Sequence, residues 1–185
     1  MNRRSLLTAL GVGALCTLPQ LPAWASEAKE IAVDGFTFVV PDGWRHVKAG
    51  AGENSVTHLG LWVQGNYADQ AFIALDEDQD PGSTLAAFAQ VTENDMRSRL
   101  SKVFVDTRDK LQMPNGMPAL RMKVEYLAGD SDTLYQQYVW LIYDGQIGIS
   151  LAVGGRVGRI DLDQATKIAS TLTVVWRGDG PPPPP

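Results

Sequence analysis

Leu134–Tyr143 is the segment that most constrains the fold. Apolar or aromatic side chains occupy both alternate sets of positions in this run, so neither face of the strand is suited to water. We therefore expect it at the centre of a sheet. Asp144-Gly145 follows, a dipeptide typical of a type I′ hairpin turn, and leads into a strand over 147–153. Small residues alternate along that strand, which predicts that a helix packs closely on this face: Gly148, Ser150 and Ala152.

Four other segments have the pattern of strands. Over 120–126 apolar residues alternate with Arg121, Lys123 and Glu125, which indicates one buried and one wet face. The other three are short apolar or alternating runs, one of which stops at the turn residues Pro41-Asp42-Gly43: Phe36–Val40, 59–63 and 71–75. Together with the two central strands they predict an antiparallel sheet of about six strands.

Two helices are expected beside the sheet. Apolar residues recur at helical spacing over 83–102, with Asp80 as a candidate N-cap and Pro81 as the first helical residue. Asp161 and Gln164 have the spacing of a capping box before a second helix. The apolar stripe of that second helix comprises Leu162, Ala165, Ile168 and Leu172. The predicted fold class is α+β, an antiparallel sheet with helices packed on its faces.

Residues 1–25 have the organisation of a signal peptide. A short cationic start precedes an apolar stretch over 6–18, and Ala23-Trp24-Ala25 is an A-x-A cleavage signal, which places cleavage after Ala25. The paired Arg3 and Arg4 fit a twin-arginine export signal, and an ordinary Sec signal explains them equally well. The apolar stretch is shorter than the roughly 20 residues that cross a bilayer. We therefore expect a periplasmic or secreted protein without an integral membrane span.

Cleavage changes the composition of the chain. It removes Arg3, Arg4 and Cys16 but no acidic residue, so the net charge goes from −5 to −7 and no cysteine is left. Neither a disulfide nor a thiol nucleophile is then available, and the acidic charge disfavours nucleic acid as a partner. The folded domain is predicted over 26–176. Residues 177–185, which end in five prolines, are predicted to form a disordered Gly/Pro-rich tail.

An acidic cluster is the main candidate for metal chemistry. Asp76, Asp78 and Asp80 match the D-x-D-x-D opening of a calcium loop, but Pro81 and Ala87 replace the glycine and the bidentate glutamate that such a loop needs. Acidic residues before a helix also stabilise its positive end, which explains the cluster without a metal. His46 and His58 lack the spacing of a ligand pair. We predict no metal site and no cofactor.

A glycine-rich stretch over 154–159 is a weak candidate for anion binding. It follows a strand and precedes a helix, and it carries Arg156 and Arg159, so backbone N–H groups and two guanidinium groups could converge on an anion. The stretch matches neither common nucleotide-binding motif, and a flexible strand-to-helix loop is the alternative reading. Ser150 lies within a predicted strand with both histidines upstream, which does not fit a serine hydrolase. No catalytic residue is predicted.

Phe36–Val40 followed by Pro41-Asp42-Gly43-Trp44 resembles the F-x-F-x-x-P-x-G-W opening of the DcrB and PsbP-like family. Met117-Pro118-Ala119 before an alternating strand and Ser170-Thr171-Leu172 at the end of the last helix extend the resemblance. It implies an exported bacterial member with an antiparallel sheet flanked by helices. It also implies a non-enzymatic role as an accessory or binding protein.

Three functions remain open at this stage. The first is an exported interaction or ligand-binding accessory protein of the cell envelope, whose partner is a protein or a small molecule. The second is an immunity or chaperone protein that masks a secreted effector or toxin. The third is a metal-dependent hydrolase that uses Asp76, Asp78, Asp80 and a histidine.

Overall fold

The structure is a computed structural model that describes residues 29–33, 36–48, 56–65, 70–127 and 132–179. The expected signal peptide with its cleavage site at Ala25, and the prolines of the expected tail, lie outside these residues. No helix in the described part of the chain has the length and apolar character needed to cross a membrane.

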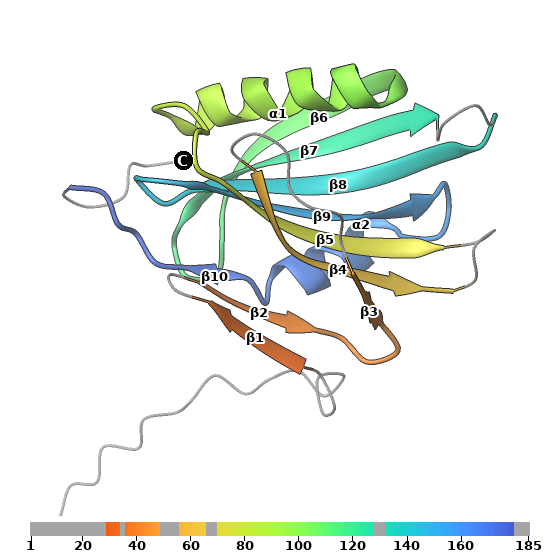
Figure 1. The fold of residues 1–185 in the computed structure, drawn as a ribbon, viewed down its shortest axis with the longest axis horizontal. Helices are drawn as coiled ribbons and strands as arrows, with labels where there is room; N and C mark the ends of the chain where they lie inside the picture. Colours follow the sequence, from red (N-terminus) through yellow and green to blue (C-terminus); the bar gives the residue numbers. More distant parts are fainter. Residues whose placement is uncertain (1–28, 34–35, 49–55, 66–69, 128–131, 180–185) are drawn as a thin grey trace, which may run out of the picture.

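The described strands form two antiparallel sheets (Figure 1). The larger sheet has seven strands in the order β3-β4-β5-β9-β8-β7-β6, and the smaller has three in the order β1-β2-β10. The larger sheet comprises β3 (Arg45–Val47), β4 (Val56–Gln64), β5 (Ala71–Asp78), β9 (Gly148–Arg156), β8 (Leu134–Tyr143), β7 (Pro118–Leu127) and β6 (Ser101–Gln112). The smaller comprises β1 (Lys29–Val33), β2 (Phe36–Val40) and β10 (Thr173–Val174).

The α+β class is confirmed, whereas the prediction of one sheet with about six strands is wrong. The main sheet is larger, and Phe36–Val40 belongs to the separate small sheet. The pattern missed β6 because this long edge strand exposes most of its side chains and therefore carries little apolar periodicity. Leu134–Tyr143 does lie inside the main sheet, between β9 and β7, and seven consecutive residues of it are buried.

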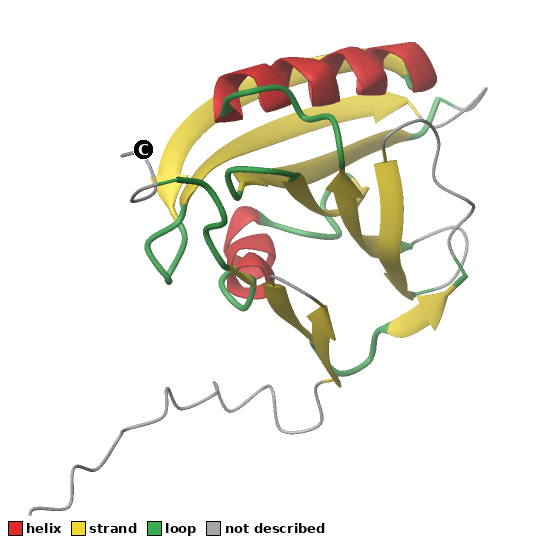
Figure 2. Cartoon of the chain, turned by 60° about the vertical axis from the view of Figure 1, so that its left-hand side comes forward, coloured by secondary structure: helices red, strands yellow, loops and turns green. Residues whose placement is uncertain are grey.

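Two layers cover the main sheet on opposite faces (Figures 1 and 2). Helix α1 (Leu85–Arg99) lies along one face and packs on β6, β7 and β8. Helix α2 (Leu162–Ala169) packs on β8 and β9, and the small sheet lies on the same side as α2. Each face therefore has its own core. The core under α1 includes Phe88, Met122, Val124, Val139 and Leu141, and the opposite core includes Phe38, Ile73, Leu75, Ile149 and Leu151.

The start of α1 differs from the prediction. Thr84 is the N-cap, because its hydroxyl accepts a hydrogen bond from the Ala87 N–H. Asp80 lies before the helix, where its backbone N–H donates to Asp78. The chain turns between the two at Gly82, whose φ of 85° disfavours other residues.

Helix α2 begins as predicted. Asp161 and Gln164 form a reciprocal capping box, in which each side chain accepts a hydrogen bond from the other residue's backbone N–H. Ala165 and Ile168 are buried on the predicted apolar stripe, whereas Leu162, the first helical residue, is 36% exposed. Leu172, the last residue of the predicted stripe, is fully buried but lies beyond the end of the helix.

The turn after β8 is not the predicted type I′ turn. Such a turn needs a positive φ at both central residues, and in the described chain Lys102 is the only residue other than glycine that has one. Asp144 instead acts as an acceptor, since its Oδ1 takes hydrogen bonds from the N–H groups of Gln146 and Ile147. Its other oxygen, Oδ2, lies 2.6 Å from Nε of Arg177. Arg177, placed by sequence at the start of the tail, is thus held against the domain.

A buried carboxylate connects α1 to the edge of the sheet. Glu93 is 8% exposed at its side chain and accepts hydrogen bonds from Arg97, on the same helix, and from Arg108 on β6. The hydrogen bond from Arg108, supported by Arg97, holds the pKa of Glu93 below its usual value. Ionised Glu93 therefore stabilises the docking of α1 on β6.

Replacing Glu93 by glutamine is expected to lower the free energy of unfolding by about 1 kcal/mol at pH 7, a value reduced because both arginines are half exposed. Since the folded pKa lies below the unfolded one, this stabilisation is complete above the unfolded pKa of Glu93, near 4.5, and is lost as the pH falls through the folded value. Urea unfolding at pH 7 and pH 3 checks it. The control is Asp95→Asn, which breaks an exposed pair with Arg99 on the same helix. Equal effects of both substitutions would contradict the assignment.

Candidate functional site

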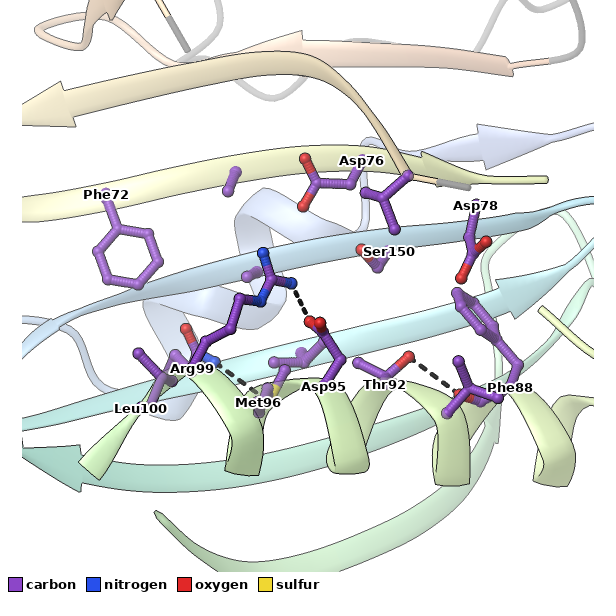
Figure 3. Close-up of a pocket in the computed structure, with 16 residues that line it drawn as sticks. Phe72, Asp76, Asp78, Phe88, Thr92, Asp95, Met96, Arg99, Leu100 and Ser150 are labelled. Carbon is purple, nitrogen blue, oxygen red and sulfur yellow. Dashed lines mark hydrogen bonds and ion pairs between the residues drawn. The ribbon is translucent and has the colours of Figure 1, made fainter. Parts of the chain in front are cut away.

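The main cavity lies between α1 and the part of the sheet that α1 does not cover. We call it the α1 groove; its volume is about 480 Å³. Helix α1 packs on β6, β7 and β8, and beside it side chains from the same face of β9, β5 and β4 line the cavity (Figure 3). The lining residues are Val56 on β4; Phe72, Ala74, Asp76 and Asp78 on β5; Ser150 and Ala152 on β9; Gln137 and Val139 on β8; and Phe88, Val91, Thr92, Asp95, Met96, Arg99 and Leu100 from α1 and its end.

The floor of the groove is the small-residue face of β9. The sequence predicted that a helix backbone packs on Gly148, Ser150 and Ala152, and the structure corrects this. Gly148 is close to α1, since a Cβ atom there would lie 2.6 Å from the Phe88 ring. Helix α1 docks instead on the larger side chains of β7 and β8, which bury more apolar area. Ser150 and Ala152 line the groove, and Ala152 also packs against the edge of the core under α1.

The polarity of the groove changes along β5. Alternate residues of a strand share a face, and Phe72, Ala74, Asp76 and Asp78 all line the cavity, in that order. The neighbouring strand β9 repeats the change, since Ala152 pairs with Ala74 and Ser150 pairs with Asp76. The groove thus has an apolar end and an acidic end. Figure 3 shows Phe72 at one end and Asp78 at the other.

Asp76 is paired with a histidine on the adjacent strand. Nδ1 of His58, on β4, lies 2.6 Å from Oδ1 of Asp76, and both side chains are about one-quarter exposed. Burial raises the pKa of Asp76 above its usual value, while the hydrogen bond with His58 and the charges of His58 and Arg99 offset part of this effect. His58 thus satisfies one of the two acids at the polar end.

Asp78 is the more buried acid. It is 6% exposed, and its Oδ1 accepts a hydrogen bond from the Asp80 N–H at 2.9 Å. Among the described residues no cation forms an ion pair with it. Figure 3 shows its carboxylate directed toward α1, beside the Phe88 ring. The acidic end therefore holds a buried carboxylate without a cation among the described residues.

The helical wall carries both charged and apolar groups. Asp95 and Arg99, one turn apart on α1, form an ion pair at the groove. Met96 lies between them in sequence, and its sulfur accepts a weak hydrogen bond from the Gln137 amide on the floor. The acids among the lining residues outnumber the single arginine, so the groove is acidic overall.

The structure places the calcium candidates in a different geometry from a calcium loop. Asp76 and Asp78 belong to strand β5, and Asp80 lies beyond the strand and outside the groove lining. In the part of the chain that the structure describes, no three His, Cys, Asp or Glu side chains are grouped so that they could hold a metal ion. The two histidines are also separated, since His46 packs on the Trp62 ring and His58 pairs with Asp76.

The anion candidates Arg156 and Arg159 lie away from the α1 groove. Strand β9 continues through Gly154 and Gly155 to Arg156, so the predicted loop is partly strand. A Cβ at Gly154 would lie 2.6 Å from the carbonyl oxygen of Gln136, which shows that this glycine is needed for close strand packing. A turn follows, with the Arg159 N–H donating to the Arg156 carbonyl. Anion binding by the two arginines stays a prediction.

A second, smaller depression of about 320 Å³ lies beside α2. Pro41 and Trp44, from the motif that resembles the DcrB and PsbP-like family, line it together with Ile160, Lys167 and Ile168. It contains fewer polar groups than the α1 groove. Sequence reasoning identified neither cavity, although it singled out Asp76, Asp78 and Ser150 for other roles.

Comparison with known proteins supports the fold. Neither a protein-family model nor a curated protein matches the chain. LpqN, described as involved in cell envelope biogenesis of Mycobacterium tuberculosis, is a structural neighbour with a TM-score of 0.53 and 16% identity, covering 80% of this chain and 90% of its own. At that identity the likeness shows a shared fold.

Two further solved structures are similar at lower scores. One is a Pseudomonas aeruginosa protein of unknown function, PA94, described as a putative regulator, with a TM-score of 0.46, 10% identity and coverage of 71% of this chain and 85% of its own. The other is from Bacteroides thetaiotaomicron, with a TM-score of 0.47 and 15% identity. The match covers 79% of this chain and 46% of the Bacteroides chain.

Proposed function

We propose that this chain is a non-catalytic, exported ligand-binding protein of the cell envelope, which holds a small molecule in the α1 groove. The observation that carries the proposal is the groove itself. Phe72 and Ala74 are left only partly buried on a sheet face that α1 could have covered, and Val91 on the helix is 40% exposed. A mostly apolar cleft with a few placed polar groups is the usual form of a small-molecule site.

The arrangement of polar groups supports a non-catalytic role. His58, Asp76 and Ser150 lie opposite one another on β4, β5 and β9, so the three side-chain types of a serine hydrolase are present in one row. Their order is unsuitable, because hydrolysis needs the histidine between the serine and the carboxylate. Here Asp76 occupies the middle strand, and His58 is two strands away from Ser150, about 10 Å at the usual strand spacing.

Export and an envelope location rest on two separate supports. The first is the sequence of residues 1–25, with its cationic start, apolar stretch and A-x-A cleavage signal before Ser26. The second is the fold shared with LpqN, which is described as involved in cell envelope biogenesis. Membership of the DcrB and PsbP-like family, whose members act as accessory or binding proteins, is part of the same proposal.

The proposal predicts that the groove binds an uncharged apolar probe. N-phenyl-1-naphthylamine should gain fluorescence with the purified protein. Ala152→Phe, which fills the floor, should abolish the gain. Ala86→Phe is the matched control, because this residue is exposed on α1 outside the groove lining. Ala74→Phe fills the groove from β5 if Ala152→Phe does not fold.

Circular dichroism and thermal unfolding establish that each variant is folded. Loss of the signal in the filled variants and its retention in Ala86→Phe would support the proposal. No fluorescence gain with the unmodified protein, or an equal gain with the filled variants, would overturn it.

A further inference from the structure

The ligand of the groove can be specified further from the asymmetry of its lining. This inference rests on the proposed function and concerns the same site. The apolar end is formed by Phe72 and Ala74 on the floor and Leu100 beside the helix, while Asp76 and Asp78 form the other end. From residue 72 to residue 78 the strand rises about 20 Å, enough for a molecule with a distinct tail and head.

Asp78 supplies the second observation. An ionised carboxylate that is 94% buried costs free energy unless a positive charge or several donors compensate it. Asp78 receives one backbone hydrogen bond, from Asp80, and no ion pair from the described residues. The nearest acid in the groove, Asp76, already has His58 as its partner. A cation from outside the chain would complete the environment of Asp78.

An aromatic ring stands beside the same carboxylate. Phe88 packs over Gly148, and Gly148 is the cross-strand neighbour of Asp78. Figure 3 shows the ring next to the Asp78 side chain. Phe88 is 2% exposed, so a cation held by Asp78 would lie beside the part of the ring that lines the groove, where an aromatic ring attracts an ammonium group. An anionic or neutral head group would gain from neither feature.

We propose that the α1 groove binds an amphipathic ammonium compound, with its ammonium group at Asp78 beside the Phe88 ring and its apolar chain along Ala74 and Phe72. Asp76, paired with His58, lies two residues before Asp78 on the same face of β5. The chemistry is that of a primary alkylamine, which occurs as a free amine or as the ethanolamine head of a lipid.

The test is displacement of bound N-phenyl-1-naphthylamine by three ligands that share the same decyl chain and differ in head group: decylammonium, decanol and decyl sulfate. Decylammonium is expected to displace the probe at a concentration at least about tenfold below that of decanol, with decyl sulfate the weakest. Asp78→Asn should weaken the binding of decylammonium about tenfold and leave the binding of decanol unchanged. Asp80→Asn removes the same charge from an exposed position outside the groove and should change both by less than about twofold.

The outcomes separate this inference from the proposed function. If the probe binds but decylammonium has no advantage, or if Asp78→Asn and Asp80→Asn have equal effects, the ammonium site is wrong and the binding function stands. If the probe does not bind the unmodified protein, the function itself fails. If Asp78→Asn does not fold, Asp76→Asn replaces it in the test. This variant is expected to weaken the binding of decylammonium and leave the binding of decanol unchanged. Displacement by lysophosphatidylethanolamine as well as decylammonium would support a lipid source, and displacement by decylammonium alone would support a free amine.

Discussion

Replacing Asp144 by alanine is expected to lower the free energy of unfolding by about 2–4 kcal/mol. The side chain is fully buried, and it accepts hydrogen bonds from two backbone N–H groups and from Arg177. Its removal leaves the buried N–H of Ile147 without its side-chain acceptor and breaks the ion pair with Arg177, whose backbone N–H still donates to the Asp144 carbonyl oxygen. Urea or thermal unfolding of the purified variant measures the loss.

The same ion pair can be broken from the other side. Arg177→Ala, or a chain that ends at Trp176, leaves the buried Asp144 carboxylate with its two backbone donors but without a cation. We expect a smaller loss, about 1–3 kcal/mol, since the backbone donors remain. A chain ending at Gly178 retains the pair and is the control. Stability unchanged by truncation at Trp176 would contradict a structural role for Arg177.

Replacing Phe88 by alanine is expected to cost about 3–5 kcal/mol, because the ring is 2% exposed and belongs to the core under α1. The substitution also removes the side chain that seats the start of the helix on Gly148. Chemical denaturation with far-ultraviolet circular dichroism reports the change.

A double-mutant cycle isolates the contact between ring and glycine. Gly148→Ala alone should cost about 1–3 kcal/mol, since its Cβ would lie 2.6 Å from the Phe88 ring. In the Phe88→Ala background the new methyl group has space, so the same substitution should cost little or stabilise. Additive effects would show that α1 is positioned by other contacts.

The elements that sequence predicted well are those whose environment is local. Both faces of Leu134–Tyr143 are apolar, and this alone required a covered central strand. The capping box of α2 is formed by residues three apart. The edge strand β6 was missed because exposed charges dominate it. The β8–β9 turn was misassigned because the Asp144 side chain accepts hydrogen bonds from the N–H groups of Gln146 and Ile147. The ion pair that compensates this buried carboxylate involves Arg177, 33 residues further along the chain.

The α1 groove could not be predicted from the sequence for a related reason. Its residues come from β4, β5, β8, β9 and α1, and the cavity exists only because α1 docks over β6 to β8. The alternation of small residues on β9 was visible, but the same pattern can receive a helix or be left open. The acids of β5 were visible too, and were assigned to a calcium loop or to the end of a helix. Tertiary packing decides whether the small residues of β9 receive a helix and where the acids of β5 lie.

The two faces of β9 have separate environments. Ile149, Leu151 and Val153 belong to the core beneath α2, whereas Ser150 and Ala152 on the other face contribute little to it. A change of size or polarity at Ser150 would alter what fits in the groove, whereas a change at Ala152 would also affect the core under α1. One strand thus supplies a core residue and a groove residue in alternation, so the groove face can be altered by substitution while the core face keeps the fold.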